Sequence, residues 1–300
     1  MNKIALAGGT SGVGHAFWDA LEAQQAHAYI LLTRKPIDNP KAVVVDYSDV
    51  DALKSVLEAH NVTTVISAIS IADESSGQAQ LNLIKAADLS TKTKRFLPSE
   101  FGADYTPEHV KMIPTYAWKL QARDVLAKTR LEYSIVSNGI FLDYWGRPRV
   151  PTRLHQGRPL FLDLANKCAS IPGNGDQILV LSHSVDVARH VMYMLDLPTW
   201  GETNFFVGER LTINEFAAMA EEILGKFKVS HDTTEDLIAG KVTMLPAYGP
   251  PSEPLISFFS GLHLLSTKGY FDIDAAKRES SQVSSMKSIK VKDIIEAWKE

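Results

Sequence analysis

The sequence predicts an α/β fold built on a doubly wound parallel sheet, and three observations carry that prediction. The first half of the chain alternates short apolar runs with amphipathic helical stretches. The apolar runs are continuous, which is typical of strands buried on both faces of a parallel sheet. A glycine-rich turn, AGGTSGVGH at 7–15, joins the first apolar run to the first helical stretch. Folds of this kind bind their ligands at the carboxyl ends of the strands.

The predicted elements follow one another in strand–helix order. The strands are expected at 3–8, 28–33, 42–47, 62–70, 94–99 and 132–139. The helices are expected at 14–24, 49–60, 76–90, 116–129, 184–195 and 212–226, the last opened by a Thr212–Glu215 capping box. After residue 145, Pro- and Gly-rich segments predict irregular loops. We therefore expect a Rossmann-type dinucleotide-binding domain over 1–150. The remainder, 151–300, is expected to be mainly a smaller, substrate-covering subdomain, interleaved with the last Rossmann elements.

The bulk composition excludes several classes of protein. A net charge of -4 provides no basic field, so neither nucleic acid nor a membrane surface is expected as a partner. No apolar run approaches the ~18 to 20 residues that span a bilayer. The single Cys168 excludes an internal disulfide, and the nine histidines form no HxxH or HExxH pair, so no metal site is expected. Without a secretory signal pattern at its start, the chain is expected to be cytoplasmic.

The glycine turn predicts a phosphate-binding site. Gly8, Gly12 and Gly14 satisfy a GxxxGxG pattern between a predicted strand and a predicted helix. Glycines let the backbone approach a pyrophosphate, and the first turn of the helix offers free N–H donors. The alternative is a glycine turn without a ligand. The predicted cofactor contacts from this turn are Gly8, Thr10, Ser11, Gly12, Val13 and Gly14.

The end of the second predicted strand indicates which dinucleotide binds. An NAD site has an acidic residue there, whereas this chain has LLTRKP at 31–36, with no acid until Asp38. Arg34 and Lys35 suit a 2′-phosphate, and a charge-assisted hydrogen bond of about 1.5 to 3 kcal/mol would favour NADPH by roughly ten- to a hundred-fold. The predicted cofactor is therefore NADPH/NADP+. The alternative is that both cations are simply solvated.

Further cofactor contacts are expected after the third and fourth strands. Asp46 and Tyr47 follow the third strand and are expected to reach the adenine. Ser67 and Ala68 follow the fourth strand and are expected to back the adenosine ribose and the phosphates.

Four spaced motifs resemble landmarks of one family. They are RFLPSEFGADY at 95–105, AWKLQARDVLAKTRLEYSIVSNGIF at 117–141, IPGNGDQILVLSHSVDVAR at 171–189 and LTINEFAAMAEEILGK at 211–226. In this order they resemble the NmrA-like and isoflavone-reductase-like group of atypical short-chain dehydrogenases. The resemblance runs from residue 3 to about 228 and fades from about 230 to 270. It implies the family and not a particular substrate.

The stretch TYAWK at 115–119 holds the candidate catalytic residue. Ordinary short-chain dehydrogenases place tyrosine and lysine four residues apart, whereas Tyr116 and Lys119 are three apart and Thr115 stands at the tyrosine position. The resemblance implies that Lys119 works without that tyrosine, holding the nicotinamide ribose and serving in proton transfer. An ammonium enclosed with cofactor and substrate loses hydration, which lowers its pKa toward a useful range. The alternative is a solvent-facing helix lysine.

The remaining candidates come from segments that follow strands. The resemblance implies that Ser99 and Phe101 line the nicotinamide pocket. Asn138 is expected to bond backbone or the cofactor amide, with a turn-stabilising role as an equal alternative. The predicted substrate contacts, for which packing is the alternative, are Tyr105, His109, Tyr144 and Trp145.

Together these features predict an NADPH-dependent reductase of a small aromatic or polyketide-like molecule of secondary-metabolite type, with Lys119 as proton donor. The first alternative is a dinucleotide-sensing regulator without hydride transfer, the one case in which a protein partner is expected. The second is an NADP(H)-binding isomerase or cyclase.

Overall fold

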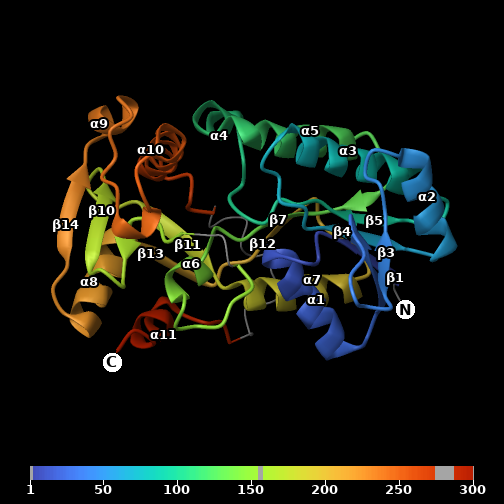
Figure 1. The fold of residues 1–300 in the computed structure, drawn as a ribbon, viewed down its shortest axis with the longest axis horizontal. Helices are drawn as coiled ribbons and strands as arrows, with labels where there is room; N and C mark the ends of the chain where they lie inside the picture. The colour runs from blue at the N-terminus through green and yellow to red at the C-terminus, as the bar shows by residue number, and fades with distance from the viewer. Residues whose placement is uncertain (1–2, 155–157, 274–286, 300) are drawn as a thin grey trace. The chain divides into compact units, whose positions relative to one another are not determined.

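A six-stranded parallel sheet forms the centre of the first of two units in the chain (Figure 1). Its order is β3-β2-β1-β4-β5-β6, so the strand order reverses between β1 and β4. The strands are β1 (Lys3–Ala7), β2 (Ala28–Thr33), β3 (Ala42–Val44), β4 (Thr64–Ser67), β5 (Arg95–Leu97) and β6 (Glu132–Tyr133). Each neighbouring pair is parallel. The predicted doubly wound fold is confirmed, and the reversal between β1 and β4 is where such folds bind ligands.

The structure is a computed structural model that describes residues 3–154, 158–273 and 287–299. Contacts divide the chain into two units. The first comprises residues 1–101, 115–136 and 187–204, and the second comprises residues 102–114, 137–186 and 205–300. The units are thus interleaved in sequence. The boundary predicted at residue 150 separates a cofactor-binding domain from a substrate-covering subdomain, and these two ligand roles remain predictions.

Helices cover both faces of the sheet in the first unit. They are α1 (Gly12–Gln24), α2 (Val50–Ala59), α3 (Glu74–Leu89), α5 (Ala117–Leu126) and the later part of α7 (Ser184–Asp196). Helices α2, α3 and α5 lie on one face of the sheet, with α1 and α7 on the other (Figure 1). The sequence of α2 shows why it forms: Asp49 caps its start by accepting from the Ala52 N–H, and Leu53 and Leu57 bury one face. These leucines join the apolar core between sheet and helices.

The second unit contains two three-stranded sheets, in the orders β14-β10-β9 and β13-β11-β8. Its strands are β8 (Ile140–Phe141), β9 (Leu162–Asp163), β10 (Cys168–Pro172), β11 (Ile178–Ser182), β13 (Glu209–Thr212) and β14 (Lys228–Asp232). Its helices are α4 (Pro107–Met112), α6 (Asp143–Gly146), α8 (Ile213–Leu224), α9 (Thr234–Ile238), α10 (Glu253–Thr267) and α11 (Val291–Glu296). The predicted capping box of Thr212 and Glu215 is present at the start of α8. No helix in the described ranges is long and apolar enough to cross a membrane.

Two predicted elements differ from those observed. The strand predicted at 132–139 is broken at Ser134: β6 pairs with β5, whereas β7 (Ile135–Ser137) pairs with β12 (Thr203–Phe205). The break occurs because the Ile135 N–H donates to the carbonyl of Glu202, 2.8 Å away, and no longer to the central sheet. The helix predicted at 116–129 begins at Ala117, after a 3₁₀ turn over Pro114–Tyr116.

Gly77 allows α5 to pack closely against α3. A Cβ added at Gly77 would lie 2.3 Å from Cδ2 of Trp118, near the root of the indole ring. Trp118 directly precedes Lys119 on α5. The absence of a side chain at Gly77 therefore sets how closely the lysine-bearing helix approaches its neighbour.

Gly77→Ala should lower the free energy of unfolding by about 1 kcal/mol or more. Overpacking against a ring costs about 1 to 3 kcal/mol, which exceeds the 0.5 to 1 kcal/mol that alanine gains over glycine inside a helix. Urea unfolding followed by tryptophan fluorescence measures the change. In a Trp118→Ala background the obstructing ring is gone, and the same substitution should be neutral or stabilising. An equal loss in both backgrounds would show that the contact does not limit the packing.

Candidate active site

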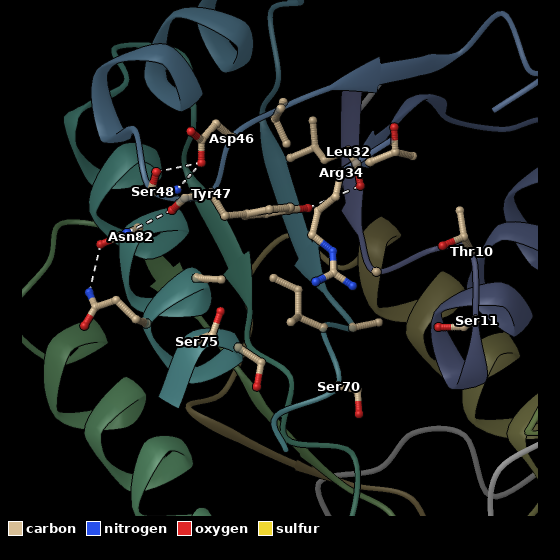
Figure 2. Close-up of a pocket in the computed structure, with 18 of the residues that line it drawn as sticks. Thr10, Ser11, Leu32, Arg34, Asp46, Tyr47, Ser48, Ser70, Ser75 and Asn82 are labelled. Carbon is tan, nitrogen blue, oxygen red and sulfur yellow. Dashed lines mark hydrogen bonds between the residues drawn. The ribbon is translucent and has the colours of Figure 1, made fainter. Parts of the chain in front are cut away.

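A groove of about 860 Å³ lies at the carboxyl ends of the central strands in the first unit (Figure 2). This volume falls within the range of about 300 to 1,000 Å³ that small-molecule and cofactor sites occupy. The glycine turn and the segments after β2, β3 and β4 form its sides, and the start of α3 completes it. The lining residues are Gly8, Thr10, Ser11, Leu32, Thr33, Arg34, Val44, Val45, Asp46, Tyr47, Ser48, Ala68, Ile69, Ser70, Ala72, Asp73, Ser75, Ser76, Gln78, Ala79 and Asn82.

The glycines of the turn are required by close contacts. Gly8 has φ +76°, and an added Cβ would lie 2.4 Å from the carbonyl oxygen of Ala68, after β4. A Cβ on Gly14 would in turn lie 2.2 Å from the carbonyl oxygen of Gly8. No larger residue fits at either position, so the turn lies directly against the segment that follows β4.

The first turn of α1 fits a phosphate group. Gly12, its first residue, has φ +55°, and no atom lies within 4 Å of a Cβ built there. Ser11, at the N-cap, makes no side-chain capping hydrogen bond. The first N–H groups of a helix lack intrahelical acceptors and carry the positive end of its dipole. Open space in front of them accommodates an anion such as a dinucleotide phosphate.

The structure places the predicted cofactor residues unevenly around this groove. Those that line it are Gly8, Thr10, Ser11, Arg34, Asp46 and Ala68. The predicted cofactor residues that are not part of its lining are Gly12, Val13, Gly14, Lys35, Ser67, Ser99, Phe101, Lys119 and Asn138. Ser67 is fully buried at the end of β4, whereas Lys35 is exposed. The cofactor contacts themselves remain predictions.

Arg34 is the cation that the second strand delivers to the groove. Its guanidinium points inward between the Tyr47 ring and the glycine turn (Figure 2). The charge of Arg34 affects two neighbouring groups. Burial raises the pKa of the Tyr47 hydroxyl, and Arg34 opposes that rise. Hydrogen bonds from Ser76 lower the pKa of the Asp73 carboxyl, and the charge of Arg34 contributes to the lowering. The groove is thus lined by a positive charge suited to an anionic ligand group.

Several lining residues on the α3 side were not predicted. Asn82 Nδ2 donates to the carbonyl of Tyr47 at 2.8 Å, and Gln78 Nε2 donates to Asn82 Oδ1 at 2.9 Å (Figure 2). The Tyr47 hydroxyl donates to the carbonyl of Leu32 at 3.2 Å. These bonds fix Tyr47 as one wall of the groove. The polar start of the helix after the fourth strand, ESSGQ, was the signal in the sequence that pointed here.

Asp46 lies at a tight turn beside this wall. Its carboxylate accepts from the Ser48 hydroxyl at 2.7 Å and from the Ser48 N–H at 2.8 Å. These two bonds lower the pKa of Asp46, so the group is an anion at neutral pH and acts only as an acceptor.

Lys119 is buried, and the alternative of a solvent-facing lysine is wrong. The side chain belongs to α5, and the residue is 9% exposed. Its Nζ donates to the carbonyls of Ser99 and Glu100, at 2.8 and 2.7 Å. Burial lowers the pKa of Lys119 to about 8; Glu100 opposes the lowering and Arg123 adds to it. An ammonium with this pKa exchanges protons near neutral pH.

The segment after β5 that holds Lys119 is itself well supported. The Ser99 N–H donates to Gln80 Oε1 at 2.8 Å, and the Ser99 hydroxyl donates to the carbonyl of Ile69 at 2.8 Å. The Phe101 ring packs on Phe17, with ring centroids 4.8 Å apart. Ser99 and Phe101 thus fix the segment, and their predicted place beside the nicotinamide remains a prediction. Gln80, fully buried on α3, was missed by the sequence analysis.

The other predicted residues lie in the second unit, and four of them are buried in its fold: Tyr105, His109, Asn138 and Trp145. Asn138 is fully buried, and its N–H donates to the carbonyl of Gly102 at 2.9 Å. His109 is also fully buried, with its ring 5.5 Å from that of Tyr105, centroid to centroid. The Trp145 indole N–H donates to two main-chain carbonyls, those of residues 160 and 162, each at 3.1 Å.

Tyr144, which precedes Trp145, is only half-buried. Substrate roles for all four aromatic and histidine side chains remain predictions. Among the residues that the structure describes, no group of three or more His, Cys, Asp or Glu side chains could hold a metal ion.

The doubly wound sheet, its glycine turn and the groove define a dinucleotide-binding protein, and comparison with known proteins identifies the family. A family model described as NAD(P)H-binding matches residues 8–160. The chain is 40% identical over 232 residues to Oxidoreductase BOA1 of Botryotinia fuckeliana, covering 75% of this chain and 77% of that protein. It is 31% identical over 276 residues to Oxidoreductase swnN of Metarhizium robertsii, covering 82% and 81%. The chain belongs to the NAD(P)H-binding family, within the NmrA-like and isoflavone-reductase-like atypical short-chain dehydrogenases.

Solved structures share the fold over nearly the whole chain. The leucoanthocyanidin reductase–NADPH complex from Vitis vinifera matches with a TM-score of 0.74 at 20% identity, covering 98% of both chains. AtPrR2 with NADP+ and (+)pinoresinol matches with a TM-score of 0.76 at 19% identity, also covering 98% of both.

The family and the named relatives confirm the predicted class of enzyme. The protein is an oxidoreductase with a nicotinamide dinucleotide cofactor, which sets aside the predicted alternative of a non-catalytic regulator. The predicted form of the cofactor, NADPH/NADP+, agrees with the dinucleotides in both solved structures.

Arg34→Ala should weaken NADPH binding by roughly ten- to a hundred-fold and leave NADH binding nearly unchanged. The substitution removes a charge-assisted hydrogen bond to the 2′-phosphate, a group that NADH lacks, and such a bond contributes about 1.5 to 3 kcal/mol. Calorimetric titration with NADPH, NADP+, NADH and NAD+ at one salt concentration measures it. Lys35→Ala is the matched control, because it removes the same charge one residue away but outside the groove lining. Equal effects of the two variants would assign the preference to general charge.

Proposed function

We propose that this protein is an NADPH-dependent reductase of a small aromatic or polyketide-like molecule, in which Lys119 donates the proton. The single observation that carries the proposal is the buried Lys119 ammonium, whose pKa is about 8 and whose Nζ is held beside the segment after β5. A general acid works best when its pKa lies near the operating pH.

Two kinds of chemistry are needed for such a reduction. NADPH, when bound, supplies the hydride. The chain supplies the rest: the turn from Gly8 to Ser11 and the first turn of α1 bind phosphate, and Arg34 binds the 2′-phosphate. Lys119 then protonates the atom of a carbonyl or enone that would otherwise become negative.

The surroundings of Lys119 suit proton donation. Two acceptors of Nζ, the carbonyls of Ser99 and Glu100, are main-chain groups. Carbonyl oxygens stabilise the ammonium but cannot take its proton, so they orient the acid without competing for it. Desolvation opposes the charge and makes release easier than from a lysine in water. Below pH 8, the protonated form predominates.

The substrate class rests on the family resemblance and on the small-molecule ligands of similar proteins. One structure with the same fold contains (+)pinoresinol, and another belongs to leucoanthocyanidin reductase.

Reduction should transfer one deuterium from deuterated NADPH to each product molecule. We expect label in the product from either the 4R- or the 4S-deuterated cofactor, measured by mass spectrometry on a panel of aromatic ketones, enones and polyketide-like lactones. Unlabelled NADPH in D₂O is the control, and it should place deuterium only where a proton was delivered. A product formed without label from either cofactor would identify an isomerase or cyclase instead.

Lys119→Ala should keep NADPH binding within several-fold and lose most turnover, by roughly a hundred-fold or more. For the wild-type enzyme, kcat should fall as pH rises through about 8, because the acid form is lost above the pKa of Lys119. Rate measurements across the pH range with saturating NADPH test both statements.

The residual activity of Lys119→Ala should lack this alkaline decline. Lys128→Ala serves as the control, since it removes an exposed lysine just beyond the same helix and should change neither kcat nor its pH dependence. Full turnover in Lys119→Ala would remove the lysine from the mechanism.

A further inference from the structure

A buried ion pair lies behind Lys119 in the first unit. Glu100 follows β5 and is fully buried, and its Oε2 accepts from Arg123 at 2.9 Å. Arg123 lies four residues after Lys119 on α5, so both side chains project from the same helical face. The main-chain carbonyl of the same Glu100 accepts from Lys119 Nζ at 2.7 Å. Glu100 is therefore joined to Lys119 through its backbone and to Arg123 through its carboxylate.

The ion pair determines where that carbonyl lies. A carboxylate with no exposed surface is strongly destabilising unless it is paired, so Glu100 remains where the Arg123 guanidinium meets it. Fixing the Glu100 side chain also fixes its main-chain carbonyl. The neighbouring carbonyl of Ser99 is held separately, by the Gln80 side chain that accepts from the Ser99 N–H. The carbonyls of Ser99 and Glu100 thus each belong to a residue that another side chain holds in place.

The ion pair also presents two opposite charges to the ammonium. Glu100, from the segment after β5, raises the pKa of Lys119, and Arg123, from α5, lowers it. Helix α3, which packs against α5, contributes to this segment the uncharged Gln80. Among the described residues, Oε1 of Glu100 has no hydrogen-bond partner, so its negative charge is compensated at one oxygen only. The two charges act on the proton affinity of Lys119 in opposite directions, and the effect of Glu100 is the larger.

We propose that Glu100 and Arg123 are positioning residues for Lys119, holding the ammonium in place and setting how readily it releases its proton. The catalytic consequence rests on the proposed function of Lys119 as proton donor, whereas the effect on Lys119 itself does not. An ion pair that fastened α5 to the segment after β5 without acting on the ammonium would leave the titration of Lys119 unchanged.

The two partners should shift the titration of Lys119 in opposite directions. Glu100→Gln keeps the shape and the main-chain carbonyl but removes the negative charge, so Lys119 should lose its proton about one pH unit lower. Arg123→Met removes the positive charge and leaves the Glu100 carboxylate without its cation, so Lys119 should hold its proton about one pH unit higher. Arg123→Lys retains the charge and should return the titration most of the way to the wild-type position.

The titration is read directly by NMR on protein containing ¹³C-ε-labelled lysine, saturated with NADP+, with the Lys119 signal assigned by its loss in Lys119→Ala. Lys128→Met is the matched control, because it removes one exposed positive charge just beyond α5 and should shift nothing. Glu100→Gln is nearly isosteric and decides the question if Arg123→Met does not fold. An unchanged or upward shift in Glu100→Gln would overturn the proposal.

The pH dependence of kcat in the same variants separates this inference from the proposed function. If kcat follows the NMR titration in both directions, both hold. If the Lys119 signal moves and the pH dependence of kcat does not, the positioning role stands and Lys119 is not the proton donor. Binding of NADPH should stay within several-fold of wild type in each variant.

Discussion

The burial of one ammonium group constrains most of the first unit. A cation held out of water must be met by acceptors, and Lys119 meets the carbonyls of Ser99 and Glu100. Those carbonyls can point inward only if the segment after β5 is held in place, which Gln80 does from α3 and Arg123 from α5. The two helices must then lie close together. The bare Cα of Gly77 against Trp118 provides that approach.

The groove depends on a comparable close contact in the middle of the same sheet edge, where β1 and β4 end. Gly8 lies so close to the carbonyl of Ala68 that the turn after β1 and the segment after β4 form one continuous surface at the reversal of strand order. Gly12 leaves open the space in front of α1, and Arg34 adds a full positive charge nearby. Steric demand thus fixes the shape of the groove, while the helix dipole and one side chain supply its electrostatic preference.

Local pattern predicted much of this arrangement, and distant contacts account for what it missed. The sheet, the glycine turn and Arg34 follow from strand periodicity and from position after a strand, which are properties of short segments. The break between β6 and β7 could not be predicted, because the Ile135 N–H takes a partner, Glu202, from a remote part of the chain. In the sequence, Gln80 is one of several polar residues on a predicted amphipathic helix, and nothing local distinguishes it. Its role requires knowing that the Ser99 N–H lies 2.8 Å from its oxygen.

The supports of Lys119 and the lining of the groove belong to the same unit, although its three segments are separated in sequence. Ser99, Glu100 and Arg123 lie on either side of residues 102–114, which belong to the second unit. The chain therefore leaves the first unit directly after Phe101 and returns just before α5, the helix that carries Lys119. The hydrogen bonds that support Lys119 thus join residues of one unit, although a segment of the other unit interrupts that unit in sequence.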